Sequence, residues 1–160
     1  MANIGALLTA TFTATSLKTS GIGWSVGDHF EDQDGKIYKF VQYNVGAGPV
    51  AAVTGNVAYY YAPSGASAGA TSVVTSDLSD SAGLGAGVLM SAPADGEYCW
   101  LQIKGPATLT TALTAGADGN ALTAVGATDG TLDVSALVTD AIVAYAVDAS
   151  AKIVMCDFPW

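Results

Sequence analysis

Short apolar stretches run along the chain, and turns rich in glycine and polar residues separate them. The apolar stretches contain many tyrosine, valine, isoleucine and phenylalanine residues, which favour strands. We expect strands over residues 36–45, 50–61, 72–75, 87–91, 97–104, 141–147 and 151–156. Many short strands with turn signals between them are typical of small β-domains. The pattern therefore predicts an all-β protein, either a small antiparallel β-sandwich or a β-barrel with long Gly/Ala/Ser-rich loops.

The first 20 residues differ from the rest of the chain. They are rich in threonine and hold no acidic residue, and threonines alternate there with Phe12 and Ala14. A period of two indicates extended backbone. We expect residues 1–20 to form an extended N-terminal arm, either an edge strand or a segment that reaches a neighbouring subunit. Residues 21–160 would then form a single β-rich domain, with two small lobes, about 21–62 and 71–160, as the alternative.

Two local patterns refine this prediction. Asp34-Gly35 stands between apolar runs and predicts a β-hairpin with a type I′ turn, because that turn needs positive φ angles. The runs Tyr38 to Tyr43 and Tyr98 to Ile103 share the order Tyr, any residue, aromatic, aliphatic, Gln, apolar. Alternation puts the aromatic residues of each run on one face and the aliphatic residues on the other. Each strand should therefore be covered on both faces, by its own core and by a second layer or subunit.

Composition narrows the possible functions. The chain has 19 glycines and 29 alanines, no arginine, 5 lysines and 14 acidic residues, for a net charge of −9. Polar helix formers are scarce, so a mainly helical protein is excluded. A surface so poor in cations cannot follow a nucleic-acid backbone, and its negative charge opposes docking on an anionic membrane. We expect neither nucleic acid nor membrane as a partner.

The N-terminus and the cysteines indicate the compartment of synthesis. No lysine or arginine precedes Lys18, and the apolar stretch 4–8 is too short for a signal peptide. We therefore expect synthesis in the cytoplasm. Cys99 and Cys156 lie among apolar residues, so we expect buried free thiols rather than a disulfide.

One catalytic motif is matched only superficially. Gly23-Trp24-Ser25-Val26-Gly27 fits the pattern of a nucleophile elbow. That chemistry needs a strand-to-helix turn and partners from distant loops, whereas His29 follows the serine by four residues and no helical pattern comes after it. We interpret the motif as a loop.

The other candidate sites also lack an essential part. The acidic residues from Asp28 to Asp34 do not match the calcium-loop spacing, so only an adventitious calcium site remains open there. One histidine and two distant cysteines are too few for zinc, and Gly83 to Gly87 lacks the spacing of a dinucleotide loop. Fourteen acidic residues offer many carboxylate pairs, but only Glu97 adjoins a strong strand, as its water-facing first residue. We expect no catalytic residue, no cofactor and no metal site, and hence no enzyme.

Several stretches together resemble a known family. These are Val73 to Asp77, Gly87 to Leu89, Asp95 to Ala107 with its Tyr-x-Trp-x-Gln-x-x-Gly signature, and Asp34 to Val41. Over residues 30–156 the chain is similar to small virion proteins of tailed bacteriophages, cyanophage head proteins in particular, that decorate or cement the capsid. The resemblance implies a β-rich, often trimeric protein bound outside the shell of the major capsid protein, without catalytic residues.

The expected function follows from both arguments. We expect a structural protein on the outer surface of the virion that stabilises the capsid lattice, with the major capsid protein and further copies of itself, as a homotrimer, as partners. A carbohydrate-binding or adhesin-type module is the alternative, with Trp24, Trp100 and the run Tyr59 to Tyr61 as solvent-facing platforms. Aromatic and apolar anchors dominate interfaces. The candidate interface residues are Phe12, Leu17, Trp24, Tyr59, Tyr61, Phe158 and Trp160.

Overall fold

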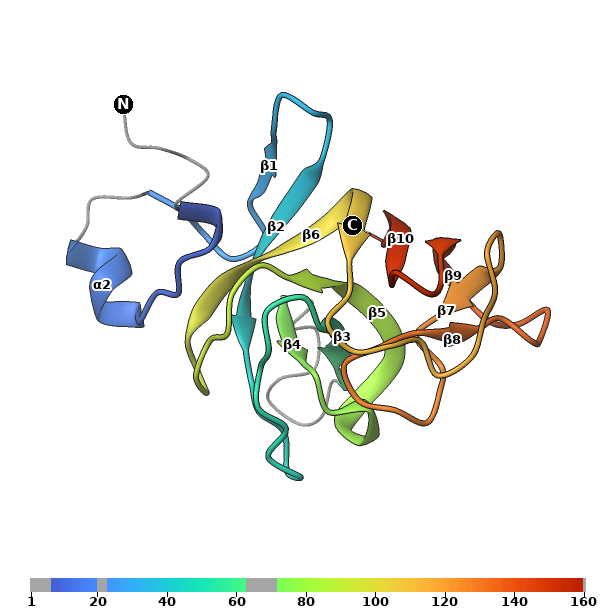
Figure 1. Cartoon of the computed structure of the whole chain (residues 1–160). Coiled ribbons are helices and arrows are strands. Elements are labelled where there is room, and N and C mark those ends of the chain that lie inside the picture. Colours follow the sequence, from blue (N-terminus) through green and yellow to red (C-terminus); the bar gives the residue numbers. More distant parts are fainter. Residues whose placement is uncertain (1–6, 20–22, 63–71, 160) are drawn as a thin grey trace.

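The chain folds into ten strands and very little helix (Figure 1), in a computed structural model that describes residues 7–19, 23–62 and 72–159. The strands are β1 His29–Glu31, β2 Ile37–Tyr43, β3 Val57–Tyr61, β4 Val73–Thr75, β5 Ser81–Leu89, β6 Tyr98–Thr108, β7 Ala121–Thr123, β8 Asp133–Val134, β9 Ile142–Asp148 and β10 Ile153–Asp157. The helices are α2, Ala14–Thr19, and the 3₁₀ turn η2, Leu78–Asp80. The prediction of an all-β protein is confirmed.

Five of the strands close into a barrel. They follow the order β2-β4-β3-β5-β6, and β6 also pairs with β2, which completes the ring. All of these pairs are antiparallel except β2 with β4, which is parallel. The barrel is thus the observed alternative, and one of its five strand pairs, β2 with β4, is parallel rather than antiparallel.

Strand β6 joins the barrel to a second group of strands. Its first half pairs with β2 and β5, and its second half pairs with β10, which continues through β9 and β7 to β8. The outer strands lie at one end of the molecule and the N-terminal segment lies at the other (Figure 1). The barrel takes strands from both sides of residues 62–71, so the alternative division into lobes 21–62 and 71–160 does not match the sheet.

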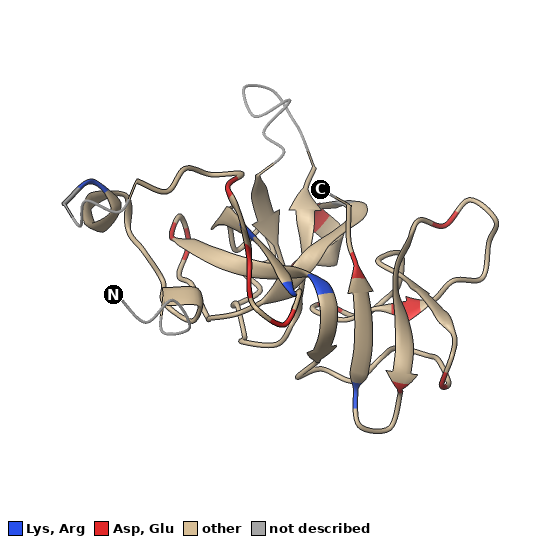
Figure 2. Cartoon of the chain, turned by 90° about the horizontal axis from the view of Figure 1, so that it is seen from above, with Lys and Arg blue, Asp and Glu red and all other residues tan. Residues whose placement is uncertain are grey.

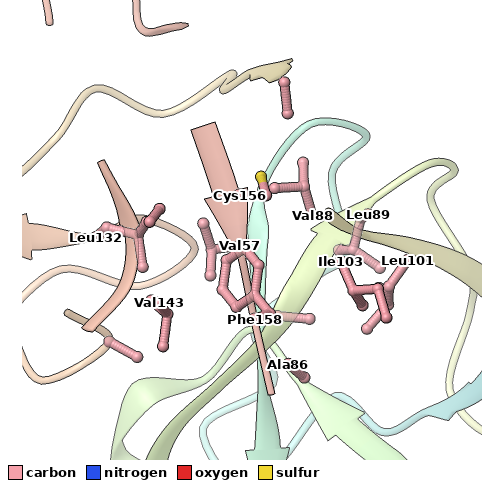
Figure 3. Close-up of a cluster of buried hydrophobic side chains, with 14 of the residues drawn as sticks. Val57, Ala86, Val88, Leu89, Leu101, Ile103, Leu132, Val143, Cys156 and Phe158 are labelled. Carbon is pink, nitrogen blue, oxygen red and sulfur yellow. The ribbon is translucent and has the colours of Figure 1, made fainter. Parts of the chain in front are cut away.

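The main core fills the barrel and continues under the outer strands. Figure 3 shows the ring of Phe158 in the middle of this cluster, among side chains from both groups of strands. Strand β5 approaches the ring so closely that a Cβ atom on Gly85 would lie 2.8 Å from Cε1 of Phe158. The absence of a side chain at Gly85 therefore leaves room for the ring of Phe158.

A second cluster lies on the opposite face of β2 and β6. It consists of Tyr38, Phe40 and Trp100 from the two strands, with Leu8 and Phe12 packed on them. The backbone N–H of Phe12 donates to the carbonyl of Tyr98 at 2.9 Å, and Tyr98 N–H donates back to Phe12 O at 2.7 Å. The second layer that the sequence predicted over these strands is the chain's own N-terminal segment.

The prediction of an extended arm over residues 1–20 is wrong for residues 14–19, whereas Phe12 forms an antiparallel bridge with Tyr98. Residues 14–19 form helix α2, and Thr13 stands at its start. The Thr13 side chain accepts from Ser16 N–H at 3.0 Å, and the Ser16 side chain accepts from Thr13 N–H at 2.8 Å. This reciprocal cap starts a helix where the threonine alternation alone indicates a strand.

The first hairpin is confirmed, but its turn type is not. Strands β1 and β2 pair with Glu31 opposite Ile37, so the turn is longer than two residues. Asp32 Oδ1 accepts from the N–H groups of Asp34 and Lys36 at 3.0 and 2.9 Å, and Gly35 has φ +75°. A single positive φ at the glycine fits a bulged turn, whereas a type I′ turn would need two in succession.

Candidate functional site

Three of the predicted interface residues belong to the chain's own core. Phe12, Tyr59 and Phe158 are all buried, and Tyr59 is completely so. The Tyr59 hydroxyl donates to the carbonyl of Thr131 and accepts from its N–H at 3.0 Å. These side chains hold distant segments of one chain together. They are not interface anchors, and the prediction is wrong for all three.

Three further candidates are half-buried. Trp24 packs edge-on against Trp100 with ring centroids 5.1 Å apart, and against Phe12 at 5.5 Å. Leu17 of α2 packs against the same cluster. Tyr61 ends β3 beside a small cavity. Trp160, the last candidate, lies outside the described residues.

Two of the aromatic platforms of the alternative function are buried, and a third is held by hydrogen bonds. Trp100 is buried, as is Tyr59. Tyr60 is bound inside the structure, because its hydroxyl accepts from Lys39 Nζ at 2.9 Å and donates to Pro159 O at 3.3 Å. Tyr59 and Tyr60 of the tyrosine run are therefore structural.

The largest exposed apolar side chains of the sheet lie on the outer strands, where the sequence analysis placed no site. Tyr145 and Val147 of β9 are 48% and 50% exposed, and Met155 of β10 is 42% exposed. Tyr145 pairs with Met155, and Met155 pairs in turn with Pro106 of β6. Pro106, Tyr145, Val147 and Met155 are called the outer apolar face below.

Charges are sparse around this face. Lys104 and Asp157 pair across β6 and β10 at its end, both exposed. Figure 2 shows most acidic residues on loops and strand ends rather than along the strands. A sheet surface with exposed aromatic and aliphatic side chains and few charges is suited to contact with another protein.

The sequence could have indicated the outer apolar face by one signal. Residues 141–147 hold no polar side chain other than the Tyr145 hydroxyl. In an antiparallel strand, polar residues normally mark the face toward water. Their absence at a strand near the surface predicts an apolar outer face, and alternate burial in β9 and β10 shows which residues form it.

The nucleophile-elbow motif forms a turn before β1, as interpreted. Asp28 Oδ2 accepts from Ser25 N–H at 2.7 Å, and Phe40 N–H donates to Asp28 O at 2.8 Å. The turn leads into a strand rather than a helix. Its geometry therefore tethers the segment to β2 and does not aim a nucleophile.

The remaining titratable groups serve the fold. Burial raises the pKa of both Cys99 and Cys156 to about 12. Both are buried free thiols, as predicted. The hydroxyl and N–H of Ser79 lower the pKa of the Asp77 carboxyl, which caps the 3₁₀ turn η2. Among the described residues, no three metal-ligating side chains gather into a cluster, and no helix is long and apolar enough to cross a membrane.

Comparisons with protein-family models, with curated proteins and with solved structures found no match to this chain.

Proposed function

We propose that this protein is a structural component of a phage virion that binds the outer surface of the capsid and stabilises the lattice of the major capsid protein. The outer apolar face is the observation that supports this proposal most directly. Tyr145, Val147 and Met155 present aromatic and aliphatic side chains side by side, on strands whose other side chains are buried in the core. The resemblance to capsid decoration proteins supports the proposal independently.

On a repeated capsid lattice, a small contact area per copy is sufficient to stabilise the shell. Each copy contacts an identical site, and many copies act on one particle, so a small contact raises the stability of the whole shell. The 14 acidic residues against 5 lysines keep coated particles soluble and apart. This balance also suits the outer side of the shell, away from packaged DNA.

The homotrimer is proposed on the resemblance alone. Strands β2 and β6 carry apolar residues on both faces, which by itself would be compatible with a subunit contact. Leu8 and Phe12 of the same chain cover the second face, so those strands need no neighbouring subunit. Sedimentation of the free protein and of protein released from particles measures the state directly.

The test uses particles from which the protein has been stripped. Shells are heated alone, with wild-type protein, and with a variant carrying Tyr145→Ser and Met155→Gln. Val53→Ser is the matched control, because Val53 is also 42% exposed and lies in a loop far along the chain from β9. We expect wild-type and control protein to raise the rupture temperature and the double variant to lose the effect.

Two results would contradict the proposal. Shells that rupture at the same temperature with and without wild-type protein would exclude cementing. Equal protection by the double variant would exclude the outer apolar face as the contact. Binding without protection would favour a decorative or adhesive role.

A further inference from the structure

The turn between β8 and β9 carries the most exposed aliphatic side chains in the described part of the chain. Leu137 is 65% exposed, and Val138 is fully exposed. Asp140 N–H donates to Leu137 O at 3.1 Å, so residues 137–140 form a β-turn with Val138 and Thr139 at its centre. The turn lies at the end of the molecule away from the N-terminal segment (Figure 1).

Turn formation alone does not explain these residues. The centres of turns favour glycine, asparagine, aspartate, serine and proline, whereas β-branched residues such as valine and threonine favour strands. Two other hydrogen-bonded turns of the chain, 94–97 and 117–120, have Asp-Gly at their centres. An aliphatic tip in water departs from the local rule, and such departures are expected at functional sites.

Three hydrogen bonds hold the aliphatic tip in place. One carboxylate oxygen, Asp140 Oδ2, accepts from the N–H groups of Ala136 and Leu137, both at 2.9 Å. With the bond from Asp140 N–H to Leu137 O, these contacts fix the backbone on both sides of Val138. A segment that is already ordered loses less conformational entropy when it binds. The tip is therefore suited to insertion into a fitted pocket.

Apolar side chains continue from the turn along β9. The register between β9 and β7 skips Val143, which therefore forms a β-bulge. Val143 and Ala144 are both buried, so the bulge leaves Ile142 on the outward side with Tyr145 and Val147. Ile142 is 49% exposed. The turn is thus continuous with the outer apolar face.

Charge distinguishes the possible occupants of this surface. Residues 109–160 contain six aspartates and one lysine, and Asp133 and Asp140 flank the turn. Two copies of the chain that met through this end would bring like charges together, which is unfavourable. The same charges oppose insertion into an anionic membrane. The surface therefore fits a different protein, with an apolar pocket and no acidic residues at its rim.

We propose that Leu137 and Val138 insert into an apolar pocket of the shell protein, while the outer apolar face packs on the surface beside that pocket. The inference rests on the proposed function, which supplies the partner. Both side chains are largely exposed in the free protein, so insertion removes most of their apolar area from water. On a repeated lattice the same pocket is available to every copy.

Co-sedimentation of the full chain with stripped shells tests the proposal. Val138→Asn removes the aliphatic tip but suits the centre of a turn, so the free protein should keep its thermal midpoint. Its affinity for shells should fall about tenfold or more, because one valine side chain is no longer buried. Val26→Asn is the matched control, since Val26 is a 42% exposed valine in the turn before β1. It should bind as the wild type does.

A cross-link identifies the occupant directly. Cys99 and Cys156 are buried free thiols, so a maleimide that carries benzophenone labels an added exposed cysteine selectively. Irradiation of labelled Val138→Cys on shells should join it to an apolar segment of the shell protein. Labelled Val26→Cys, treated in the same way, should give no such product.

The outcomes separate this inference from the proposed function. If Val138→Asn binds as the wild type does and the double variant Tyr145→Ser, Met155→Gln does not bind, the insertion is overturned and the outer apolar face remains the contact. No binding of the wild type to shells would overturn both. A dimer of the free protein that Val138→Asn dissociates would show that a second copy receives the tip, and would also overturn the insertion.

Discussion

Phe40 and Trp100 lie directly opposite each other on the antiparallel strands β2 and β6, with ring centroids 5.1 Å apart. They are the central aromatic residues of the two runs that repeat along the sequence. On either side of them, Tyr38 pairs with Gln102, and Gln42 pairs with Tyr98. The two runs are thus paired antiparallel about their central aromatic residues, so the first tyrosine of each run lies opposite the glutamine of the other.

This pairing gathers Tyr38, Phe40, Tyr98 and Trp100 on one face. Phe40 stacks on Tyr98 with ring planes 15° apart and meets Phe12 at 6.0 Å between centroids. Exposure of such an aromatic face to water would be unfavourable. The N-terminal segment covers it, so the segment is part of the fold rather than an arm for a neighbour.

Phe12→Ala is therefore expected to destabilise the free protein. The ring is buried and touches both Trp24 and Phe40, so its removal leaves a cavity under the N-terminal segment. The free energy of unfolding should fall by about 3–5 kcal/mol, which urea denaturation measures. Thr11→Ala, at an exposed position beside it, should change stability by less than about 0.5 kcal/mol. Equal, small effects of both variants would show that the segment is loosely attached.

The alternation of residues predicted strands and their faces, but not what covers a face. In the run from residue 38 to residue 43, the pattern places Tyr38 and Phe40 on the face opposite Val41, as the structure shows. Whether Phe12 or another subunit covers Phe40 is decided by contacts between segments far apart in the sequence. Local periodicity contains no information on such contacts.

The same limit explains why the sequence did not predict which tyrosines are buried and which are exposed. Tyr59 and Tyr145 are both tyrosines in apolar strands, yet one is completely buried and the other is half exposed. The backbone of Thr131 binds the hydroxyl of Tyr59 from 72 positions away, which no short window predicts. The strand that contains Tyr145 has no polar residues, so its sequence does not indicate which of its faces meets water.

Gly85→Ala should destabilise the junction between the barrel and the outer strands. An added methyl group would lie 2.8 Å from Phe158 Cε1 and 3.2 Å from Ala124 Cβ, so the core would have to shift. We expect a loss of about 1–3 kcal/mol, measured by urea denaturation. Phe158→Leu in the same chain should cost less than the sum of the two single changes, because both act on one contact.

The control for this prediction is Gly23→Ala. A Cβ atom at Gly23 would meet nothing within 4 Å, and its φ is not in the left-handed region. The variant should be as stable as the wild type or slightly more stable. Equal losses at Gly23 and Gly85 would contradict the argument from Phe158.

The protein should lose stability in alkaline solution. Burial raises the pKa of the Cys99 and Cys156 thiols to about 12, above the ordinary value of 9. The folded chain therefore keeps these protons where the unfolded chain releases them. Their contribution is complete below pH 9 and decreases as the pH rises toward 12, by about 1.4 kcal/mol per thiol for each pH unit. Burial and a hydrogen bond to Asp32 raise the pKa of Tyr38 to about 12, which adds to the loss above its ordinary value of 10.

Thermal unfolding between pH 7 and pH 10.5 measures this effect. The Tm should be nearly constant below pH 8.5 and fall above pH 9. A variant with Cys99→Ala and Cys156→Ala should be less stable at pH 7, because two buried side chains are shortened, but should lose less between pH 7 and pH 10.5. A parallel decrease in both proteins would show that the thiols do not contribute.

Capsid binding should depend little on salt if the outer apolar face makes the contact. Screening reduces the Debye length to a few Å at about 0.5 M salt, which weakens attraction between charges but not the burial of apolar surface. The affinity should change by less than about threefold between roughly 0.05 and 0.5 M sodium chloride. Tyr145→Ser should weaken binding by a similar factor at both concentrations, since it removes apolar area and no charge. Asp157→Asn, at the charged end of the face, should alter only the small remaining salt dependence. A loss of affinity of about tenfold or more in high salt would instead indicate that the acidic residues bind a basic patch on the shell, and would exclude the outer apolar face as the main contact.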